Sequence, residues 1–557
     1  MRRFLSALVM ASVLATTFPA TIPATFAQRA EKSNKKTSAQ RGLDTIAANQ
    51  LKDYLTFIAS DEMEGRDTPS RGLDTTAKFL ALNLARWGFK PAGDNGTFFQ
   101  RIDLLRNRTD GGKTKVEFND KVLSLGTDYI PASNATAGNV SGQLVFAGNG
   151  WLMKSKEMDA YKDIDPKGRI AVVFAVPNQR PRGATAADFR AQAGQEYMNP
   201  SDYARSKGVV GLIYVADSQY LANWQRNRQR IMERGSTVVA KFQSPSGPTL
   251  PSIVVSQEMA QSLLAGEKDV ESMFSDAAGV KLPPPFLMND QKKITMNVAS
   301  STETIPTQNV VAVWEGGDPT LKAEYVALGS HYDHVGSGCG PAGVEDTICN
   351  GADDDGSGTT AMLAMAEALA KATTRPKRSL LFVWHCGEEK GLWGSRYFTE
   401  NPTVPLNAIV AQINMDMIGR SKSDGDTNAS NKELSGPNAI YLIGSTMMST
   451  ELGEIVNSVN KSYLNLTFDT RYDDPKDPNR FFYRSDHINY ARKGIPIIFF
   501  FDGVHEDYHR KSDTADKIDY QKMEKVARTI YMTAWEIANR PARLKVDKPL
   551  PAQISIS

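Results

Sequence analysis

The spacing of hydrophobic and polar positions divides the chain into regions with different patterns. Between Leu43 and about Arg106, apolar residues recur every three or four positions, as in LKDYLTFIAS and TTAKFLALNLARWGF. This period predicts amphipathic helices. From about Val116 to Ile294 the chain contains short apolar runs separated by polar stretches, such as GQLVFAGNG, RIAVVFAV and PSIVVS. We therefore expect a helical region followed by a self-contained β-rich module.

From about Asn309 onwards, strand-like runs alternate with helical patterns. The runs YVALG, SLLFVW, AQINMDMIG, AIYLIG and IPIIFFF are apolar and β-branched, and GTTAMLAMAEALAKA has a helical period. Strands separated by helices predict an α/β fold with a mixed, mostly parallel sheet flanked by helices on both faces. Open sheets of this kind bind ligands beyond the carboxyl ends of their strands.

The size and composition of the chain narrow the class of protein. A chain of 557 residues is expected to form more than one domain. With 41% hydrophobic and 23% charged residues it can bury a full core, which excludes a disordered or collagen-like chain. Without Arg2 and Arg3, which lie in a segment that we expect to be removed, 63 of the 65 basic residues remain and balance the 63 acidic ones. Net charge therefore gives no attraction to nucleic acid or to an anionic membrane.

The first 27 residues have the pattern of a secretory signal. A basic start is followed by the apolar run FLSALVMASVLA and by small residues at Thr25 and Ala27, after which we expect cleavage. The alternative is a membrane anchor, but the run is shorter than the roughly 20 residues that a span needs. No later segment is long and apolar enough to span. We expect a soluble exported protein, periplasmic or extracellular, whose residues 28–42 form a flexible polar tail.

Histidines and cysteines are unevenly distributed. All six histidines lie within one third of the chain, which indicates that imidazole chemistry is confined to the C-terminal half. Three cysteines are too few for a disulfide scaffold in a chain of this length. In an oxidising compartment Cys339 and Cys349 could pair or stay unpaired, and we expect Cys386 to be buried and inert.

Metal-ligating residue types follow the ends of four predicted strands. The residues at these strand ends, together with the aspartates of the Gly-rich loop GADDDGSG, are His331, Asp333, His334, Asp353, Asp354, Asp355, Glu388, Glu389, Asp416, His505 and His509. Imidazole nitrogen and carboxylate oxygen without thiolate suit zinc, or a similar divalent ion, in a catalytic site. The carboxylates exceed what one tetrahedral ion can use, which favours two metals that share a bridging carboxylate. Of the adjacent glutamates, one can bind metal while the other acts as general acid and base.

Five motifs, taken in order, resemble a known family. HYDH, GADDDGSG, GEEKGLWGS, NMDMIG and DYH are similar to motifs of the zinc aminopeptidases of peptidase family 28, relatives of glutamate carboxypeptidase II and the transferrin receptor. The N-terminal SDEMEGRDTPSRG fits the secreted branch, and the β-rich module resembles a protease-associated domain. The resemblance is most specific between His331 and Asp516 and is weak in the inserted module.

The resemblance implies a fold and a division into domains. The fold is that of a zinc exopeptidase (phosphorylase/hydrolase-like), with the β-rich domain inserted. The implied segments are a signal peptide at 1–27, a tail at 28–42, the N-terminal part of the peptidase domain at 43–115, the inserted domain at 116–294, the di-zinc peptidase domain at 295–545 and a C-terminal tail at 546–557.

The resemblance also implies metal ligands. Asp354 bridges two zinc ions, of which the first is also held by His331 and Asp416, and the second by Glu389 and His509. The residues leave alternatives open, because His505 lies in the same loop as His509 and because a different path of the Gly-rich loop would put another aspartate in the bridge. In that second alternative, Asp353 or Asp355 would replace Asp354 as the bridge. We expect His334 to be structural or at the rim, and His385 and His487 to be hydrogen-bonded residues of the core.

Catalytic roles follow from the same resemblance. Glu388 corresponds to the general base, and Asp333 to the carboxylate that orients His331. Tyr508 corresponds to a residue that donates a hydrogen bond to the tetrahedral intermediate, and Arg484, in RSDH, to a position that contacts substrate. The peptide bond between the bridging aspartate and its successor is expected to be cis.

The implied function is that of an exported di-zinc exopeptidase that hydrolyses the N-terminal peptide bond of peptides. A first alternative is a carboxypeptidase of the glutamate carboxypeptidase type, for which the sequence does not place enough arginines at the pocket. A second is a catalytically inactive, receptor-like binding protein, and a third is a single-zinc glutaminyl cyclase. Peptides are the expected partners, and the preferred N-terminal residue does not follow from the sequence.

Overall fold

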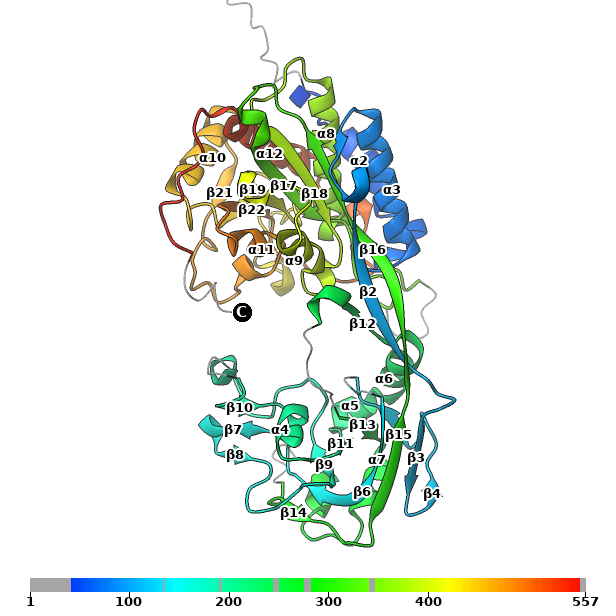
Figure 1. Cartoon of the computed structure of the whole chain (residues 1–557). Helices are drawn as coiled ribbons and strands as arrows, with labels where there is room; N and C mark the ends of the chain where they lie inside the picture. Colours follow the sequence, from blue (N-terminus) through cyan, green and yellow to red (C-terminus); the bar gives the residue numbers. More distant parts are fainter. Residues whose placement is uncertain are drawn as a thin grey trace, which may run out of the picture.

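The computed structural model describes residues 42–550, apart from 134, 136, 190–192, 244–249, 275–281 and 340–345. The expected signal peptide and most of the expected tails lie outside the described residues. The described chain forms two lobes, which are joined by the antiparallel strands β2 (Phe99–Thr109) and β16 (Ser300–Trp314) (Figure 1). Among the helices of this part of the chain, none is long and apolar enough to cross a membrane.

The upper lobe is built on a ten-stranded mixed sheet. Its order is β12-β2-β16-β18-β17-β19-β22-β20-β21, and β1 pairs with β16. The central strands β18, β17, β19 and β22 are parallel to one another, while the strands that flank this group, β16 and β20, are antiparallel to it. Continuous apolar runs such as IIFFF are buried along their length, as is typical of parallel strands covered on both faces. The remaining strand bounds are β1 (Lys90–Pro91), β12 (Ser236–Val239), β17 (Tyr325–His331), β18 (Ser379–His385), β19 (Ile409–Met415), β20 (Ala439–Ile443), β21 (Thr467–Asp469) and β22 (Ile497–Phe501).

Helices cover both faces of this sheet, as the alternation of strands and helices predicts. One core packs the sheet against α2 (Ala48–Ile58), α3 (Arg71–Arg86), α8 (Gly358–Lys371), α10 (Thr450–Ser462) and α12 (Tyr520–Asn539). The other core packs the opposite face against α9 (Trp393–Glu400) and α11 (His487–Ala491). The α/β class of this lobe is therefore confirmed.

Local sequence explains where these helices begin. The Ser70 hydroxyl accepts a hydrogen bond of 3.1 Å from the backbone N–H of Leu73 at the start of α3. The Asp519 carboxylate accepts one of 3.0 Å from the backbone N–H of Lys522 at the start of α12. Side-chain acceptors of this kind satisfy backbone donors that the first turn leaves unpaired. Helix α8 is buried on almost every side, because it lies between the sheet and helices α2 and α12.

The lower lobe contains a second sheet of nine strands. Its order is β4-β3-β15-β6-β9-β11-β13-β5, and β14 pairs with β6. Strands β6, β9, β11 and β13 are parallel. The bounds are β3 (Lys115–Phe118), β4 (Lys121–Val122), β5 (Tyr129–Pro131), β6 (Gly138–Phe146), β9 (Ile170–Phe174), β11 (Gly211–Val215), β13 (Ser252–Val255), β14 (Phe286–Leu287) and β15 (Lys293–Val298).

Short helices and a small sheet complete the lower lobe. The helices are α4 (Pro200–Ser206), α5 (Ser218–Ala222), α6 (Trp224–Gln229) and α7 (Gln257–Leu264). The three-stranded sheet consists of β7 (Leu152–Met153), β8 (Met158–Asp159) and β10 (Tyr197–Met198). The sequence predicts a β-rich module. The structure instead has an α/β lobe, because its parallel strands are connected through helices. Helices this short leave little periodic signal, and an apolar run does not reveal the direction of a strand.

One strand crosses the expected domain boundary. Residues 115–298 contain all strands of the nine-stranded sheet, but β12, from the same stretch, pairs with β2 in the upper lobe. Val239, at the end of β12, is buried in an upper-lobe core. Nothing in its sequence, STVV, distinguishes this strand from its neighbours.

The cysteines adopt one of the two expected arrangements. Cys339 and Cys349 form a disulfide, and Cys386 is free and buried.

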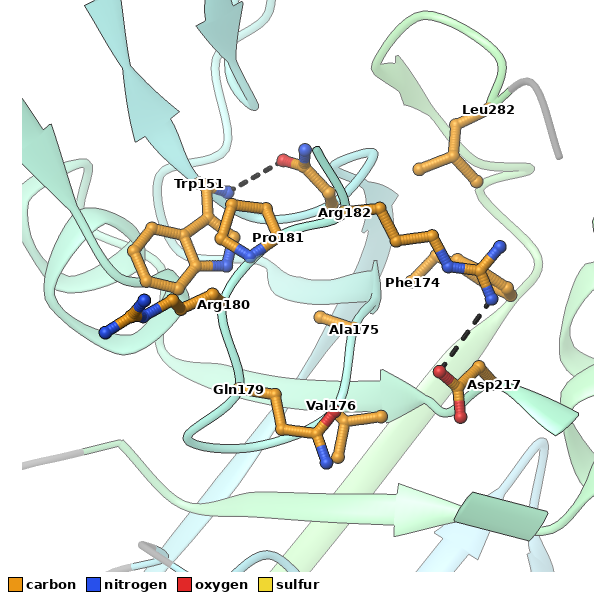
Figure 2. A pocket seen from close by; sticks show the side chains of 11 residues that line it. Trp151, Phe174, Ala175, Val176, Gln179, Arg180, Pro181, Arg182, Asp217 and Leu282 are labelled. Atoms are coloured by element: carbon orange, nitrogen blue, oxygen red, sulfur yellow. Dashed lines mark hydrogen bonds and ion pairs between the residues drawn. The ribbon is translucent and has the colours of Figure 1, made fainter. Parts of the chain in front are cut away.

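The lower lobe also encloses a cavity of about 330 Å³, which lies at the carboxyl ends of β9 and β11 (Figure 2).

Candidate metal centre

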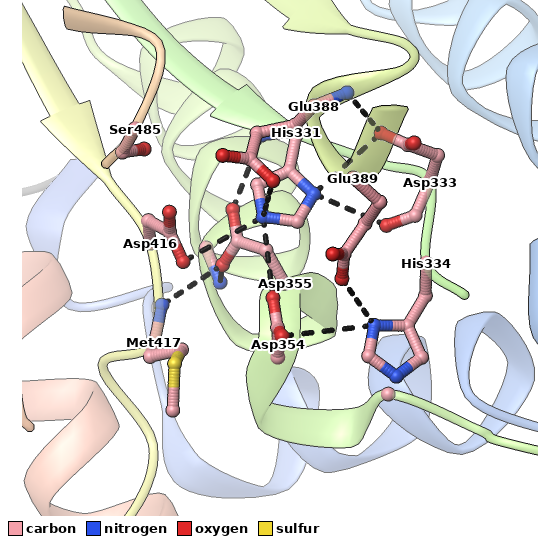
Figure 3. Close-up of polar contacts among 12 residues, drawn as sticks. His331, Asp333, His334, Asp354, Asp355, Glu388, Glu389, Asp416, Met417 and Ser485 are labelled. Atoms are coloured by element: carbon pink, nitrogen blue, oxygen red, sulfur yellow. Dashed lines mark hydrogen bonds and ion pairs between the residues drawn. The ribbon is translucent and has the colours of Figure 1, made fainter. Parts of the chain in front are cut away.

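Polar side chains from distant parts of the upper lobe converge at the carboxyl ends of its central strands (Figure 3). His331 is the last residue of β17, and Asp416 directly follows β19. Glu388 and Glu389 follow β18 after two residues, and Asp354 lies in the turn that precedes α8. Because the central strands are parallel, their carboxyl ends meet at one edge of the sheet, which brings these residues together.

The first group consists of His331, Asp354 and Asp416, whose ligand atoms all lie within 4.8 Å of one another. His331 Nε2 lies 3.3 Å from Asp354 Oδ1 and 3.6 Å from Asp416 Oδ1. All three residues are buried. This set is the one that the resemblance implies for the first ion.

The second group surrounds Asp354 and Glu389. His509 Nε2 lies 3.0 Å from Asp354 Oδ2 and 3.0 Å from Glu389 Oε2. His334, which the sequence predicts to be structural or at the rim, is fully buried against the same carboxylates. Its Nδ1 lies 3.0 Å from Glu389 Oε1 and 3.8 Å from Asp354 Oδ2. His334, Asp354 and Glu389 also form a group that could hold an ion. Two histidines therefore face this pair of carboxylates where the sequence predicts one.

Unpartnered atoms and charge both indicate that the site fits a metal. Several buried ligand atoms have no hydrogen-bond partner within the described residues: His331 Nε2, His334 Nδ1, His509 Nε2 and Glu389 Oε1. Burial alone would lower the pKa of His331, but the carboxylates around it, Asp416 first, raise this pKa well above its usual range. The site thus favours positive charge strongly. Nitrogen and oxygen ligands of this kind suit zinc.

The neighbouring aspartates of the Gly-rich loop have other partners. Asp355 accepts hydrogen bonds from the backbone N–H groups of Gly358, His331 and Met417, at 2.9, 3.2 and 3.2 Å. Asp353 accepts one of 2.7 Å from Gly419. Asp354 is the member of the loop that faces both groups. Its peptide bond to Asp355 is cis, as expected.

The other histidines lie outside both groups. His505 Nε2 lies 3.2 Å from the Asp353 carboxylate rather than at Asp354. His385 Nε2 lies 2.9 Å from the Tyr490 hydroxyl. His487 Nε2 lies 2.8 Å from the Phe482 carbonyl oxygen, and burial lowers its pKa to about 4. His385 and His487 are fully buried, which agrees with the expected core roles.

Glu388 lies beside the first group. Its Oε2 is 3.9 Å from His331 Nε2. Burial raises the pKa of the Glu388 carboxyl well above its usual range, although the charge of His331 works in the opposite direction. Tyr508 and Arg484 line a small cavity of about 30 Å³ together with Glu388, Asp354 and Asp416. The structure therefore brings the expected base, the expected hydrogen-bond donor and the expected substrate contact to one opening.

Asp333 connects His331 to the backbone of Glu388. His331 Nδ1 lies 3.1 Å from the Asp333 carbonyl oxygen and 3.6 Å from the Asp333 carboxylate. That carboxylate accepts hydrogen bonds from the Glu388 backbone N–H at 3.2 Å and from the Thr68 hydroxyl at 3.1 Å. The backbone carbonyl of Asp333 thus approaches the ring more closely than the side chain does. The carboxylate also fixes the loop that carries Glu388.

Arg66 contacts the loops of the candidate metal centre, which sequence reasoning did not predict. Its guanidinium is completely buried and donates four hydrogen bonds of 2.7–2.9 Å, all to backbone carbonyl oxygens. The acceptors belong to Ile58, Tyr332, Asn350 and Gly351. Tyr332 follows the candidate ligand His331, and Asn350 and Gly351 precede Asp354. The available signal was the EGR of the N-terminal motif, but only the fold shows what this arginine touches.

Asp513 is a second residue that the sequence did not single out. Its carboxylate accepts hydrogen bonds from the backbone N–H groups of Asp353, at 3.1 Å, and Asp354, at 3.2 Å. Burial and the charge of Asp353 raise the pKa of Asp513 to about 6. The turn that carries Asp354 is therefore held by Asp513 from one side and by Arg66 from the other.

A mixed α/β sheet with buried histidines and carboxylates at its carboxyl edge suits a metal-dependent hydrolase. Comparisons with known proteins make this class more specific. Residues 309–534 match the model of peptidase family M28. This segment contains all the residues of both groups, so the match covers the whole candidate metal centre.

Proteins similar to the chain include the following two relatives and one solved structure. Leupeptin-inactivating enzyme 1 of Streptomyces exfoliatus is 27% identical over 278 residues, which cover 49% of this chain and 54% of the relative. Leucine aminopeptidase 2 of Arthroderma otae is 23% identical over 444 residues, covering 72% and 82%. The chain thus spans about half the length of the first relative and most of the second.

The aminopeptidase from Aneurinibacillus sp. strain AM-1 has a similar structure. The two structures align with a TM-score of 0.50 at 16% identity, over 91% of this chain and 98% of the other. At this identity the alignment shows that the fold is shared.

Proposed function

We propose that the protein is an exported aminopeptidase that binds two zinc ions and removes N-terminal residues from peptides. The observation that carries the proposal is the position of Asp354. Its Oδ1 faces His331 at 3.3 Å and its Oδ2 faces His509 at 3.0 Å, so that one carboxylate serves both groups. The match to peptidase family M28 and the aminopeptidase activity named for the Arthroderma otae relative support the same reaction.

Each ion is assigned three residues. His331, Asp354 and Asp416 hold the first, and Asp354, Glu389 and His509 hold the second. His509 is preferred over His334 because its Nε2 is equally close, 3.0 Å, to both carboxylates, whereas His334 approaches only Glu389 that closely. When bound, the two ions acidify a water and polarise the scissile carbonyl.

Glu388 is assigned the proton transfers. A buried carboxyl with a raised pKa can accept a proton from the attacking water and return it to the departing amine. Its neighbour Glu389 differs, because contacts with His334 and His509 outweigh the effects of burial and of Asp354 and lower its pKa. The adjacent glutamates thus differ in the way that a division into base and ligand requires.

Tyr508 and Arg484 are assigned to the substrate. Burial, and then the nearby carboxylates, raise the pKa of Tyr508, so that its hydroxyl stays protonated and can donate a hydrogen bond to the developing oxyanion. Arg484 lines the same cavity and can donate to a substrate carbonyl. The excess of carboxylates suits a free α-ammonium group, which restricts cleavage to the amino terminus.

The function is tested with a panel of aminoacyl chromogenic amides, assayed with and without a chelator. Amides with a free amino group should be hydrolysed, the chelator should stop the reaction, and added zinc should restore it. The matched control is the same amide with an acetylated amino group, which should not react. Equal hydrolysis of free and acetylated amides would exclude an aminopeptidase.

The alternative functions explain less of the site. A receptor-like binding protein does not need the base, yet Glu388, Tyr508 and a complete set of ligands are present. A carboxypeptidase for acidic peptides needs several cations at the pocket, and among the described residues that line it Arg484 is the one basic side chain. A single-zinc cyclase does not use a carboxylate between two groups.

The lower lobe and the amino terminus belong to the same proposal. We assign the lower lobe to the protease-associated type on the resemblance of its sequence, and residues 1–27 to a signal peptide. Export is tested by sequencing the amino terminus of the protein recovered outside the cytoplasm, which should begin at Gln28. An amino terminus at Met1 would contradict cleavage.

A further inference from the structure

The cavity in the lower lobe lies at the carboxyl edge of that lobe's parallel strands. Asn149 and Trp151 come from the segment after β6, Phe174 ends β9 and several residues of 175–182 follow it, and Asp217 follows β11. Its volume of about 330 Å³ is within the range of small-molecule sites. Loops at this edge are where open α/β sheets place their ligands.

One wall of the cavity carries a buried indole donor. Trp151 is 7% exposed, and its indole Nε1–H makes no hydrogen bond within the described residues. A buried donor without a hydrogen bond is unfavourable, so its position beside a cavity suits an acceptor that enters from outside. Figure 2 shows Trp151 on one side of the cavity and the Arg182 guanidinium on the other.

The opposite wall offers a cation with a weak partner. Arg182 Nη2 lies 3.8 Å from Asp217 Oδ2, and its side chain is 63% exposed. Asp217 is itself engaged, because its Oδ1 accepts a hydrogen bond of 2.9 Å from the Tyr220 backbone N–H at the start of α5. The second arginine at the cavity, Arg180, lies over the Phe189 ring at 5.1 Å. Two arginines against one aspartate leave the lining positively charged.

The surface between these walls is mostly apolar, although the amides of Asn149 and Gln179 also line the cavity. Phe174, Val176, Pro181 and Leu282 line it, and Ala175 leaves space at its centre (Figure 2). A ligand that fits must combine an anionic end, an apolar body and a hydrogen-bond acceptor some distance from the anion. A peptide carboxyl terminus has all three: the carboxylate, an apolar side chain and the carbonyl of the preceding peptide bond.

We propose that this cavity binds the carboxyl end of a short apolar peptide. The carboxylate pairs with Arg182, the side chain packs against Phe174, Val176 and Leu282, and a backbone carbonyl accepts the Trp151 N–H. This site is additional to the metal centre and needs no zinc. It rests on the proposed function in one respect, namely that peptides are what the enzyme meets.

The test measures binding to the full-length Glu388→Gln protein by calorimetry, after removal of zinc. The probes are N-acetyl-leucyl-leucine and its C-terminal amide, which differ only in the carboxylate. Neither has the free amino group that the proposed reaction requires, so binding here and hydrolysis at the metal centre can fail separately. The acid should bind, and the amide should bind at least about tenfold more weakly, as expected for the loss of one charge-assisted contact.

Two variants test which residue makes each proposed contact with the peptide. Arg182→Ala should remove the preference for the acid, and Trp151→Phe should weaken acid and amide alike. The matched control is Arg226→Ala, an exposed arginine of the same lobe that does not line the cavity, which should bind as the parent does. Equal affinities of the parent for the two probes, or an unchanged preference in Arg182→Ala, would overturn the proposal.

Discussion

Among the residues that the structure describes, Asp354 is the one whose carboxylate faces both candidate ion positions. Its two oxygens point to different histidines, at 3.3 and 3.0 Å. Replacement by alanine removes a ligand from each position at once. We therefore expect Asp354→Ala to lose both zinc ions. Replacement of a residue that binds one ion should lose only that ion.

Zinc content after dialysis against a zinc buffer measures this difference. The exposed residue Asp424 provides the control, because Asp424→Ala should keep two ions per chain. A fully metallated Asp354→Ala protein would exclude the bridge.

Adjacent glutamates should respond differently to the same substitution. Glu388→Gln removes the base but no ligand, so turnover should fall by about 10²–10⁴-fold while both ions stay bound. Glu389→Gln removes a ligand and should lose zinc. Turnover and zinc content are measured on the same samples. An active Glu388→Gln protein would show that another group takes the proton.

The two histidines at the second position can be separated in the same way. We expect His509→Ala to lose one of two ions, because its Nε2 lies 3.0 Å from both carboxylates. His334→Ala should keep two ions with weaker binding, because His334 closely approaches Glu389 alone. The opposite result, with the larger loss in His334→Ala, would make His334 the ligand.

The short helical segment Asp61–Arg66 and the residues that follow it tie the ligand loops together. Arg66 donates hydrogen bonds to the carbonyl oxygens of Tyr332 and Gly351. The Thr68 hydroxyl donates to the Asp333 carboxylate and accepts a hydrogen bond of 3.0 Å from the Gly387 N–H. Gly65 and Arg66 also accept from the N–H groups of Gly336 and His334. This segment is remote in sequence from every ligand, yet it contacts three of the ligand loops.

Arg66→Lys keeps the charge but loses the planar fork of donors. We expect the zinc dissociation constant of the folded variant to rise by about 10- to 100-fold, as when a group that supports a ligand is lost. Competition with a chelator measures this constant, and circular dichroism verifies the fold. Arg71→Lys, at an exposed ion pair with Glu64, is the control. A lower melting temperature with unchanged zinc affinity would show that Arg66 stabilises the fold but does not support zinc binding.

At the scale of the whole molecule, the two lobes have separate hydrophobic cores. Upper-lobe residues form two clusters on the faces of the ten-stranded sheet, and lower-lobe residues form two others. A ligand stabilises only the unit that binds it. We expect calorimetry of the full chain to show two transitions, of which a chelator lowers only one. A single transition that shifts as a whole would mean that the lobes unfold together.

Much of this architecture could be predicted from the sequence. Runs such as SLLFVW and AQINMDMIG predicted the central strands, and the ligand types at their ends predicted the place of the site. His334 and Arg66 could not be placed, because their roles depend on how the loops pack rather than on residue type or spacing. The direction of the lower-lobe strands and the pairing of β12 with β2 were missed for the same reason.

The central claim is that two zinc ions share Asp354. Diffraction from crystals of the zinc-loaded protein, recorded at the zinc absorption edge, tests it most directly. The claim predicts two anomalous peaks, one among His331, Asp354 and Asp416 and one among Asp354, Glu389 and His509. A single peak, or peaks that do not touch Asp354, would contradict it.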